Sequence, residues 1–359
     1  ADREVDDAGG VHLLQRSSAG PRAARQAAPP VGAYPEEAVR CGTVAVPGVK
    51  DGAMVCSPRG AAAAGLRLPL FVLAHGDWTE PEAYGRLARS IAAFGFVVAD
   101  YRSCIWVVAG NASSECQMGQ ASFLEALKLI AGFAANPDLD AELAPVDMAR
   151  QVTVGGHSTG GRVALAVAAV KDSPAYLQGT AFAADLDRDG AGLRRAAGRV
   201  GAVIGLHPDD MHDLINNPDV EGFVGAVSET PVFVVTSVDD LGEPDGAAWR
   251  DFVEVRSSAK VYLDKNVAIR TGFSGHQEPI EYGIEAPWVA LFGQAFALGN
   301  VTARTLLYGD CPECLRNALP YGGPGWRNTG LGKIGFLLCG APAERWPAEF
   351  AGACDAKAL

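Results

Sequence analysis

The sequence lacks a hydrophobic run long enough to cross a membrane. A membrane-spanning helix needs about 20 consecutive apolar residues, and no uninterrupted stretch approaches that length although 48% of the residues are hydrophobic. Charged residues are also sparse, at 20% of the chain. We therefore expect a soluble, globular protein with no integral membrane segment.

Basic residues are the scarcer of the two charge types. The chain has 30 Lys and Arg against 42 Asp and Glu, which gives a formal net charge of −12. The basic residues are scattered, whereas a nucleic-acid surface requires them to be clustered against phosphates. The sequence predicts no nucleic-acid partner, and we interpret the acidic excess as favouring solubility.

The chain begins at Ala1 and has no charged segment followed by an apolar leader. We expect any targeting peptide to have been removed or to lie outside this sequence.

Cysteines number eight, an even count that is typical of disulfides. The expected pairs are Cys41 with Cys56, Cys104 with Cys116, and pairs among Cys311, Cys314, Cys339 and Cys354. The Cys-Pro-Glu-Cys sequence at 311–314 is the alternative start of a zinc site, but no His-x-x-x-His partner follows it. Disulfides predict an oxidising compartment, namely the exterior, a periplasm or an organelle lumen, plastids included.

Apolar runs alternate with helical patterns through the middle of the chain. Expected strands occupy residues 68–74, 96–99, 151–154, 201–206, 231–236 and 260–263, and expected helices 81–94, 122–135, 162–170 and 287–298. Strands separated by helices pair in parallel through right-handed crossovers. The sequence predicts an α/β fold with a doubly wound, mostly parallel sheet and helices on both faces, preceded by a hairpin over 41–56.

Composition divides the chain into three segments. Residues 1–35 are rich in Ala, Arg, Gly and Pro without an apolar period, and are expected to form a tail or extended segment. Residues 36–299 hold the α/β domain. Residues 300–359 hold half of the cysteines and are expected to form an extension packed on the same domain.

One short motif carries chemistry. Gly156-His157-Ser158-Thr159-Gly160 lies directly after an expected strand and directly before an expected helix. In this setting Gly-x-Ser-x-Gly forms a strained turn that exposes the serine as a nucleophile at the carboxyl edge of the sheet. The alternative interpretation is a glycine-rich structural turn, because the chain contains 43 glycines.

A nucleophilic serine needs a base, and the chain has only six histidines. His276 lies in a loop after the last expected strand of the sheet, where the topology would bring it above Ser158. His157 lies inside the motif and is expected to point away from the serine. We therefore predict His276 as the base, against the alternative of a solvated loop histidine.

The base in turn needs a carboxylate to orient its ring. Asp240 follows the expected strand 231–236 and is the predicted acid. Its neighbour Asp239, and Asp209 or Asp210 after the preceding strand, are the alternatives, since any of them could instead cap a turn.

The order Ser158, Asp240, His276 is that of the α/β-hydrolase superfamily. The sequence resembles the branch with dienelactone-hydrolase-like esterases, cutinases and polyester hydrolases, platelet-activating-factor acetylhydrolases and chlorophyllases. The resemblance covers about residues 68–298 and is strongest in LFVLAHG, SIAAFGFVVADYR and VGGHSTGG. It implies a serine esterase that acts on a hydrophobic small-molecule or polymeric ester, as in lipid degradation, without a cofactor. Thr159 is a departure, since chlorophyllases usually have Arg there.

The same resemblance implies an oxyanion hole. Its donors would be the backbone N–H of Thr159 and that of Asp77 or Trp78. Trp78 would also form a wall of the substrate pocket, with local packing as the alternative. His75 is expected to pack locally. His207 is predicted either to contact substrate or to belong to an ordinary capped turn.

An acidic loop resembles the first half of a calcium site. Asp185, Asp187 and Asp189 alternate as ligands do in such loops, but Ala196 stands where the bidentate glutamate is expected. We favour a solvated loop and predict no resident metal.

Two further function classes remain open at this point. The same residues support amidase or peptidase chemistry. A binding protein on a hydrolase fold that has lost its activity would lack one of the three side chains, and none is evidently missing.

Overall fold

The computed structural model describes residues 34–76, 79–102, 120–173, 175, 186, 191–208, 223–237, 240, 247–265, 275–281, 283, 285–308 and 336–338. Within these residues no helix is both long and apolar enough to span a lipid bilayer.

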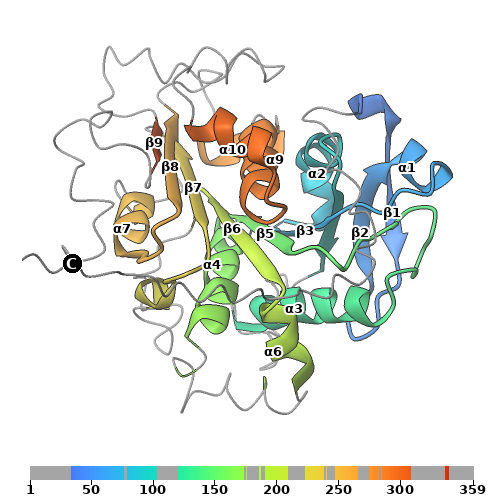
Figure 1. Ribbon diagram of the computed structural model, residues 1–359, viewed down its shortest axis with the longest axis horizontal. Coiled ribbons are helices and arrows are strands. Elements are labelled where there is room, and N and C mark those ends of the chain that lie inside the picture. Colours follow the sequence, from blue (N-terminus) through green and yellow to red (C-terminus); the bar gives the residue numbers. More distant parts are fainter. Residues whose placement is uncertain are drawn as a thin grey trace, which may run out of the picture.

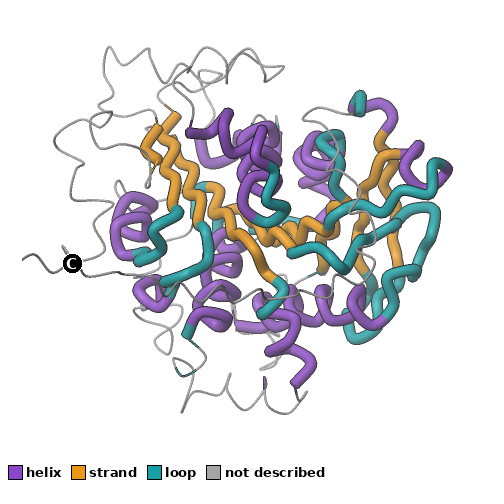
Figure 2. Tube along the Cα trace, in the orientation of Figure 1, coloured by secondary structure: helices purple, strands orange, loops and turns teal. Residues whose placement is uncertain are grey.

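In the described part of the chain, nine strands form one sheet in the order β1-β2-β4-β3-β5-β6-β7-β8-β9. Figure 2 draws the strands in orange between the helices. The strands are β1 (Val39–Val44), β2 (Ala53–Pro58), β3 (Leu70–Ala74), β4 (Val97–Tyr101), β5 (Val152–His157), β6 (Val200–Leu206), β7 (Val232–Ser237), β8 (Lys260–Lys265) and β9 (Phe336–Leu338). Neighbouring strands from β4 to β8 pair in parallel. The predicted α/β class with a mostly parallel sheet is confirmed.

Helices cover both faces of the sheet (Figure 1). On one face lie α2 (Gly85–Ala92), α9 (Ala286–Phe296) and α10 (Val301–Tyr308). On the other lie α3 (Gln120–Ala135), α4 (Thr159–Asp172), α6 (Ala191–Ala197) and α7 (Ala247–Glu254). Each layer packs on its own apolar core. The continuous apolar sequences of β3 and β6 follow from this arrangement, because a strand buried on both faces has no polar side to present.

Short elements complete the described chain. They are α1 (Arg59–Ala63), α8 (Glu278–Glu281) and the 3-10 turns η1 (Glu36–Ala38), η2 (Pro81–Tyr84), η4 (Phe223–Ala226) and η5 (Gly275–Gln277).

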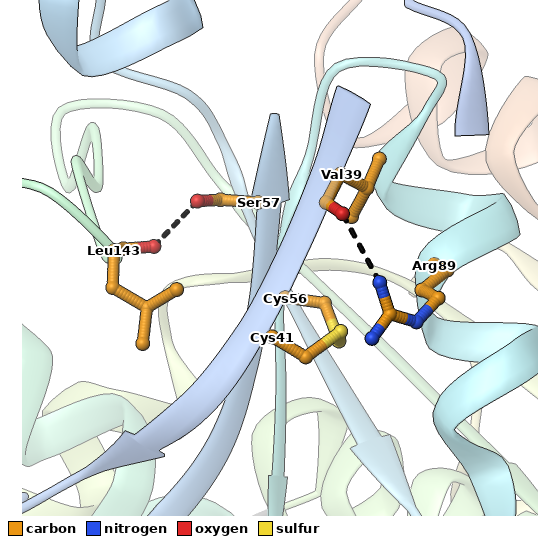
Figure 3. The surroundings of a disulfide bond; sticks show 6 residues. All are labelled: Val39, Cys41, Cys56, Ser57, Arg89 and Leu143. Carbon is orange, nitrogen blue, oxygen red and sulfur yellow. Dashed lines mark hydrogen bonds between the residues drawn. A yellow bond between two sulfur atoms is a disulfide. The ribbon is translucent and has the colours of Figure 1, made fainter. Parts of the chain in front are cut away.

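The expected N-terminal hairpin is part of the sheet. β1 and β2 are antiparallel with Cys41 opposite Cys56, and a disulfide joins the two residues (Figure 3). β2 also pairs antiparallel with β4, which extends the parallel sheet by two strands. Arg89 of α2 donates a hydrogen bond of 3.0 Å to the carbonyl of Val39. The first predicted disulfide is therefore confirmed, and the other predicted cysteine pairs lie outside the described residues.

Two described pieces of the last sixty residues pack on the sheet domain. α10 lies against α9, and β9 pairs antiparallel with β8, with Leu338 opposite Val261. The division into three segments stays a prediction, because residues 1–33 and most of 309–359 lie outside the described part.

Candidate functional site

Ser158 occupies a strained turn between β5 and α4. Its backbone has φ 55° and ψ −126°, a conformation that a residue with a side chain rarely adopts. The flanking glycines make the turn possible. A Cβ on Gly160 would lie 2.0 Å from the carbonyl oxygen of Ala74, and one on Gly156 would lie 2.1 Å from that of Gly160. The spacing of the motif is therefore required by backbone packing.

The turn is anchored at the carboxyl edge of the sheet. The backbone N–H of Ser158 donates to the carbonyl of Leu206 at the end of β6 (2.9 Å), and the N–H of Gly161 donates to that of Ser158 (2.8 Å). The Ser158 residue is partly exposed. Among the described hydrogen bonds, none joins its Oγ to the ring of His276, and such bonds often close only when substrate is bound.

The loop after β3 passes directly beside Ser158. A Cβ on Gly76 would lie 3.0 Å from the Cβ of Ser158, a contact so tight that a larger residue would require its neighbours to shift by a few tenths of an ångström. Of the predicted oxyanion donors, Asp77 and Trp78 follow in the same loop but lie outside the described residues. Thr159 is the first residue of α4 and is buried. His75 is buried with its Nδ1 at 2.9 Å from the carbonyl of Gly76, as local packing requires.

Asp240 and His276 come together beyond the ends of β7 and β8. The Nδ1 of His276 lies 3.0 Å from Oδ1 and 3.3 Å from Oδ2 of Asp240. Each residue is only 8% exposed. The structure thus pairs the two residues that the sequence predicts as acid and base. Asp239, Asp209 and Asp210 lie outside the described residues.

A second histidine contacts the same carboxylate. His207 follows β6 with φ 46°, is fully buried, and donates from Nδ1 to Oδ2 of Asp240 over 2.7 Å. Its Nε2 lies 3.9 Å from Oε1 of Glu285, the buried residue that precedes α9. The ring has no exposed surface for a ligand in this structure. The sequence places His207 directly after an expected strand, but its contact with Asp240 depends on β6 and β7 being neighbours in the sheet.

The charge of Asp240 is stabilised by these neighbours. Burial raises the pKa of the carboxyl, but the hydrogen bonds from His207 and then His276 outweigh burial and hold that pKa below its ordinary value. Asp240 therefore remains an anionic acceptor at neutral pH, as the orientation of a neighbouring imidazole requires.

His157, the buried residue before Ser158, packs close to the rings of His207 and His276. Its Nδ1 lies 2.7 Å from the hydroxyl of Tyr84, and its Nε2 lies 2.6 Å from the backbone carbonyl of His276. The rings of His157 and His276 have centroids 4.7 Å apart. Burial, then the charges of His276 and His207, lower the pKa of His157 well below its ordinary value. The loop that carries His276 is thus tied to the residue that immediately precedes Ser158, a contact that sequence reasoning missed.

Within the described residues, one group of at least three side chains has donor atoms close enough for a metal ion. It consists of His207, Asp240 and His276, whose atoms lie within 4.8 Å of one another. The contacts of 2.7 and 3.0 Å to the carboxylate are hydrogen-bond lengths that leave a ring proton between nitrogen and oxygen. An ion would have to displace both protons, so the arrangement fits a proton network better. The acidic loop with Asp185, Asp187 and Asp189 lies outside the described residues.

No protein-family model matches the chain, and no curated protein matches it in sequence.

Proposed function

We propose that the protein is a serine hydrolase of the α/β-hydrolase fold that cleaves carboxylic esters. Ser158 is the nucleophile, His276 the general base and Asp240 the acid that orients it. The observation that carries the proposal is the buried Asp240–His276 pair, 3.0 Å between Oδ1 and Nδ1, at the sheet edge where Ser158 occupies a strained turn. A packing role alone would not require this convergence of three loops.

The reaction begins with proton transfer. The Nδ1–H of His276 stays hydrogen-bonded to Asp240, so Nε2 is the ring atom that accepts the proton of Ser158 and forms the imidazolium. Oγ then attacks the ester carbonyl, and the carbonyl oxygen becomes negative. Backbone N–H groups at Thr159, where a helix begins, and in the loop that follows Gly76 stabilise this charge.

The reaction is completed in two stages, the loss of the alcohol and the hydrolysis of the acyl-enzyme. The His276 imidazolium protonates the leaving alcohol, and Ser158 keeps the acyl group as an ester. Water, deprotonated by the same imidazole, then releases the carboxylic acid and regenerates the serine. Each step balances without an added oxidant, reductant or cofactor.

The substrate class is proposed from the resemblance of the sequence to esterases that act on hydrophobic esters. Hydrophobic esters are the proposed substrates, including polyester and chlorophyll-type esters as narrower forms. The disulfide between Cys41 and Cys56 supports a secreted, periplasmic or lumenal location.

A fluorophosphonate probe tests the nucleophile. The wild-type protein should be labelled at one site, and Ser158→Ala should not be labelled. Ser228→Ala is the matched control, because Ser228 is an exposed serine outside the site. Labelling that persists in Ser158→Ala, or that is absent from the wild type, would contradict the proposal. Absence of labelling would favour a binding protein on the same fold.

Paired p-nitrophenyl esters and p-nitroanilides with the same acyl chain separate esterase from amidase action. We expect the esters to be hydrolysed faster at every chain length, with a preference for longer apolar chains. Faster hydrolysis of the anilides would replace the esterase proposal by an amidase.

A further inference from the structure

A buried tyrosine and histidine connect the loop beside Ser158 to the loop that carries His276. The backbone N–H of Gly76 donates to the hydroxyl of Tyr84 over 2.9 Å. That hydroxyl lies 2.7 Å from Nδ1 of His157, whose Nε2 lies 2.6 Å from the carbonyl of His276. The tyrosine is 0% exposed and His157 is 2% exposed, so water does not compete for these contacts.

The direction of each bond follows from the chemistry of its atoms. The backbone carbonyl of His276 can only accept, so Nε2 of His157 must carry a proton. Burial keeps His157 neutral, so its Nδ1 carries none and accepts instead. Tyr84 therefore donates its hydroxyl proton to Nδ1, and its oxygen is free to accept from Gly76. The chain of bonds is fully satisfied in one tautomer only.

The two ends of this chain lie at places that the proposed reaction uses. The backbone of Gly76 lies so close to Ser158 that a Cβ added to Gly76 would be 3.0 Å from the Cβ of Ser158. Gly76 also directly precedes the loop proposed to bind the oxyanion. The carbonyl of His276 belongs to the residue proposed as base. His157 itself precedes the nucleophile, and its backbone is fixed in β5.

We propose that Tyr84 and His157 are positioning residues that hold the oxyanion loop and the base loop at a fixed separation on either side of Ser158. This inference rests on the proposed function. The two side chains do not touch substrate. They act by keeping Gly76 and His276 in register with the nucleophile, and an error of about 1 Å in such a geometry costs on the order of 100-fold in rate.

Tyr84→Phe is the sharpest variant, because it removes one oxygen and keeps the ring in the core. We expect the fluorophosphonate labelling rate and kcat to fall about 10- to 100-fold, with KM changed less than about 2-fold. Tyr262→Phe is the matched control, since Tyr262 is a buried tyrosine in the core on the opposite face of the sheet. Rates equal to wild type in Tyr84→Phe would overturn the positioning role.

The tautomer of His157 gives a readout that does not depend on activity or on a variant. ¹⁵N chemical shifts of the wild-type protein should report a neutral ring with the proton on Nε2 between pH 6 and 8, a range about the ordinary histidine pKa. A proton on Nδ1, or a charged ring, would overturn the chain of bonds. If the wild-type protein is not labelled at Ser158, the proposed function fails. If it is labelled but Tyr84→Phe reacts equally fast, only the positioning role fails.

Discussion

Asp240 accepts hydrogen bonds from two histidines that follow different strands. His207 approaches Oδ2 from the end of β6, and His276 approaches Oδ1 from the loop after β8. A carboxylate with both oxygens engaged has little freedom to rotate. The ring of His276 is therefore held in one orientation, with Nδ1 directed at the carboxylate.

Replacement of this carboxylate by an amide tests its role. Asp240→Asn keeps the shape but offers His276 the wrong donor pattern, so we expect kcat for an ester to fall by roughly 10⁴-fold. Asp138→Asn is the control, because Asp138 forms an exposed ion pair with Arg67 and should leave the rate unchanged. A fall of less than about 10-fold in Asp240→Asn would remove Asp240 from the proposed mechanism.

The same carboxyl makes stability depend on pH. Its pKa is lower in the folded protein than in the unfolded chain, so its contribution is complete above about pH 4 and is lost as the pH falls below that value. We expect the free energy of unfolding of the wild type to fall relative to Asp240→Asn between about pH 4 and pH 2. Denaturant titrations at several pH values measure this difference. If the stability advantage of the wild type over Asp240→Asn instead grew as the pH fell, the prediction would be contradicted.

The pKa of Asp100 is shifted in the opposite direction from that of Asp240. Asp100 is fully buried on β4, and among the described residues neither of its carboxylate oxygens has a hydrogen-bond partner of acceptable geometry. Burial raises its pKa well above the ordinary value, and the backbone of Tyr101 offsets only part of that rise. Stability is then lost as the pH rises above about 4, where the unfolded chain ionises. We expect Asp100→Asn to stabilise the protein by about 1–3 kcal/mol at pH 7 and less at pH 4. If Asp100→Asn were less stable than the wild type at pH 7, the carboxyl group of Asp100 would be shown to stabilise the fold.

At the scale of elements, the turn between β5 and α4 depends on close approach to β3. In Gly160→Ala the added methyl carbon would lie 2.0 Å from the carbonyl oxygen of Ala74. That oxygen belongs to the backbone and cannot move aside as a flexible side chain would, so we expect a loss of about 3 kcal/mol or more and loss of labelling at Ser158. Gly192→Ala is the matched control, because no atom of the described residues lies within 4 Å of a Cβ added at this position of α6. That change should be neutral or stabilise by up to about 1 kcal/mol in thermal unfolding. Similar effects of the two substitutions would disprove this packing argument.

Local sequence patterns were sufficient for the parallel strands and their main helices. β3 and β6 are continuous apolar runs close to their predicted ranges, and β7 is apolar over its first four residues. β5 begins as predicted but continues through the glycines to His157. The helices α6, α7 and α10 were missed because they are short or only weakly periodic. β9 and the antiparallel pairing of β2 with β4 depend on contacts between distant parts of the chain, which no local pattern encodes.

The site was predictable to the extent that it follows strand ends. The glycine spacing predicts Ser158, and the positions after β7 and β8 predict Asp240 and His276. The structure places these last two residues in contact, and the catalytic roles of all three stay predictions. The contact of His207 with Asp240 requires β6 and β7 to be neighbours, and the contact of His157 with Tyr84 joins residues 73 positions apart. Pairings of this kind become visible only when the order of strands is known.

At the scale of the whole molecule, the disulfide fixes one margin of the sheet. Cys41 and Cys56 are separated by 15 positions, and a loop of that size contributes about 3 kcal/mol by restricting the unfolded chain. We expect the double variant Cys41→Ser, Cys56→Ser to lose about this amount in denaturant unfolding while labelling at Ser158 persists at low temperature. Loss of labelling in a protein that remains folded would show that the hairpin supports the site directly.

The order of strands has a consequence for how the molecule comes apart. β5, which leads into Ser158, is the middle strand of the described sheet, with four strands on each side of it. Opening motions begin at margins, where backbone groups have a partner on one side only, and reach interior strands last. Amide protons of β1 and β9 should therefore exchange with solvent long before those of β5. Fraying at either margin of the described sheet would therefore leave Ser158 in its turn until β5 itself opens.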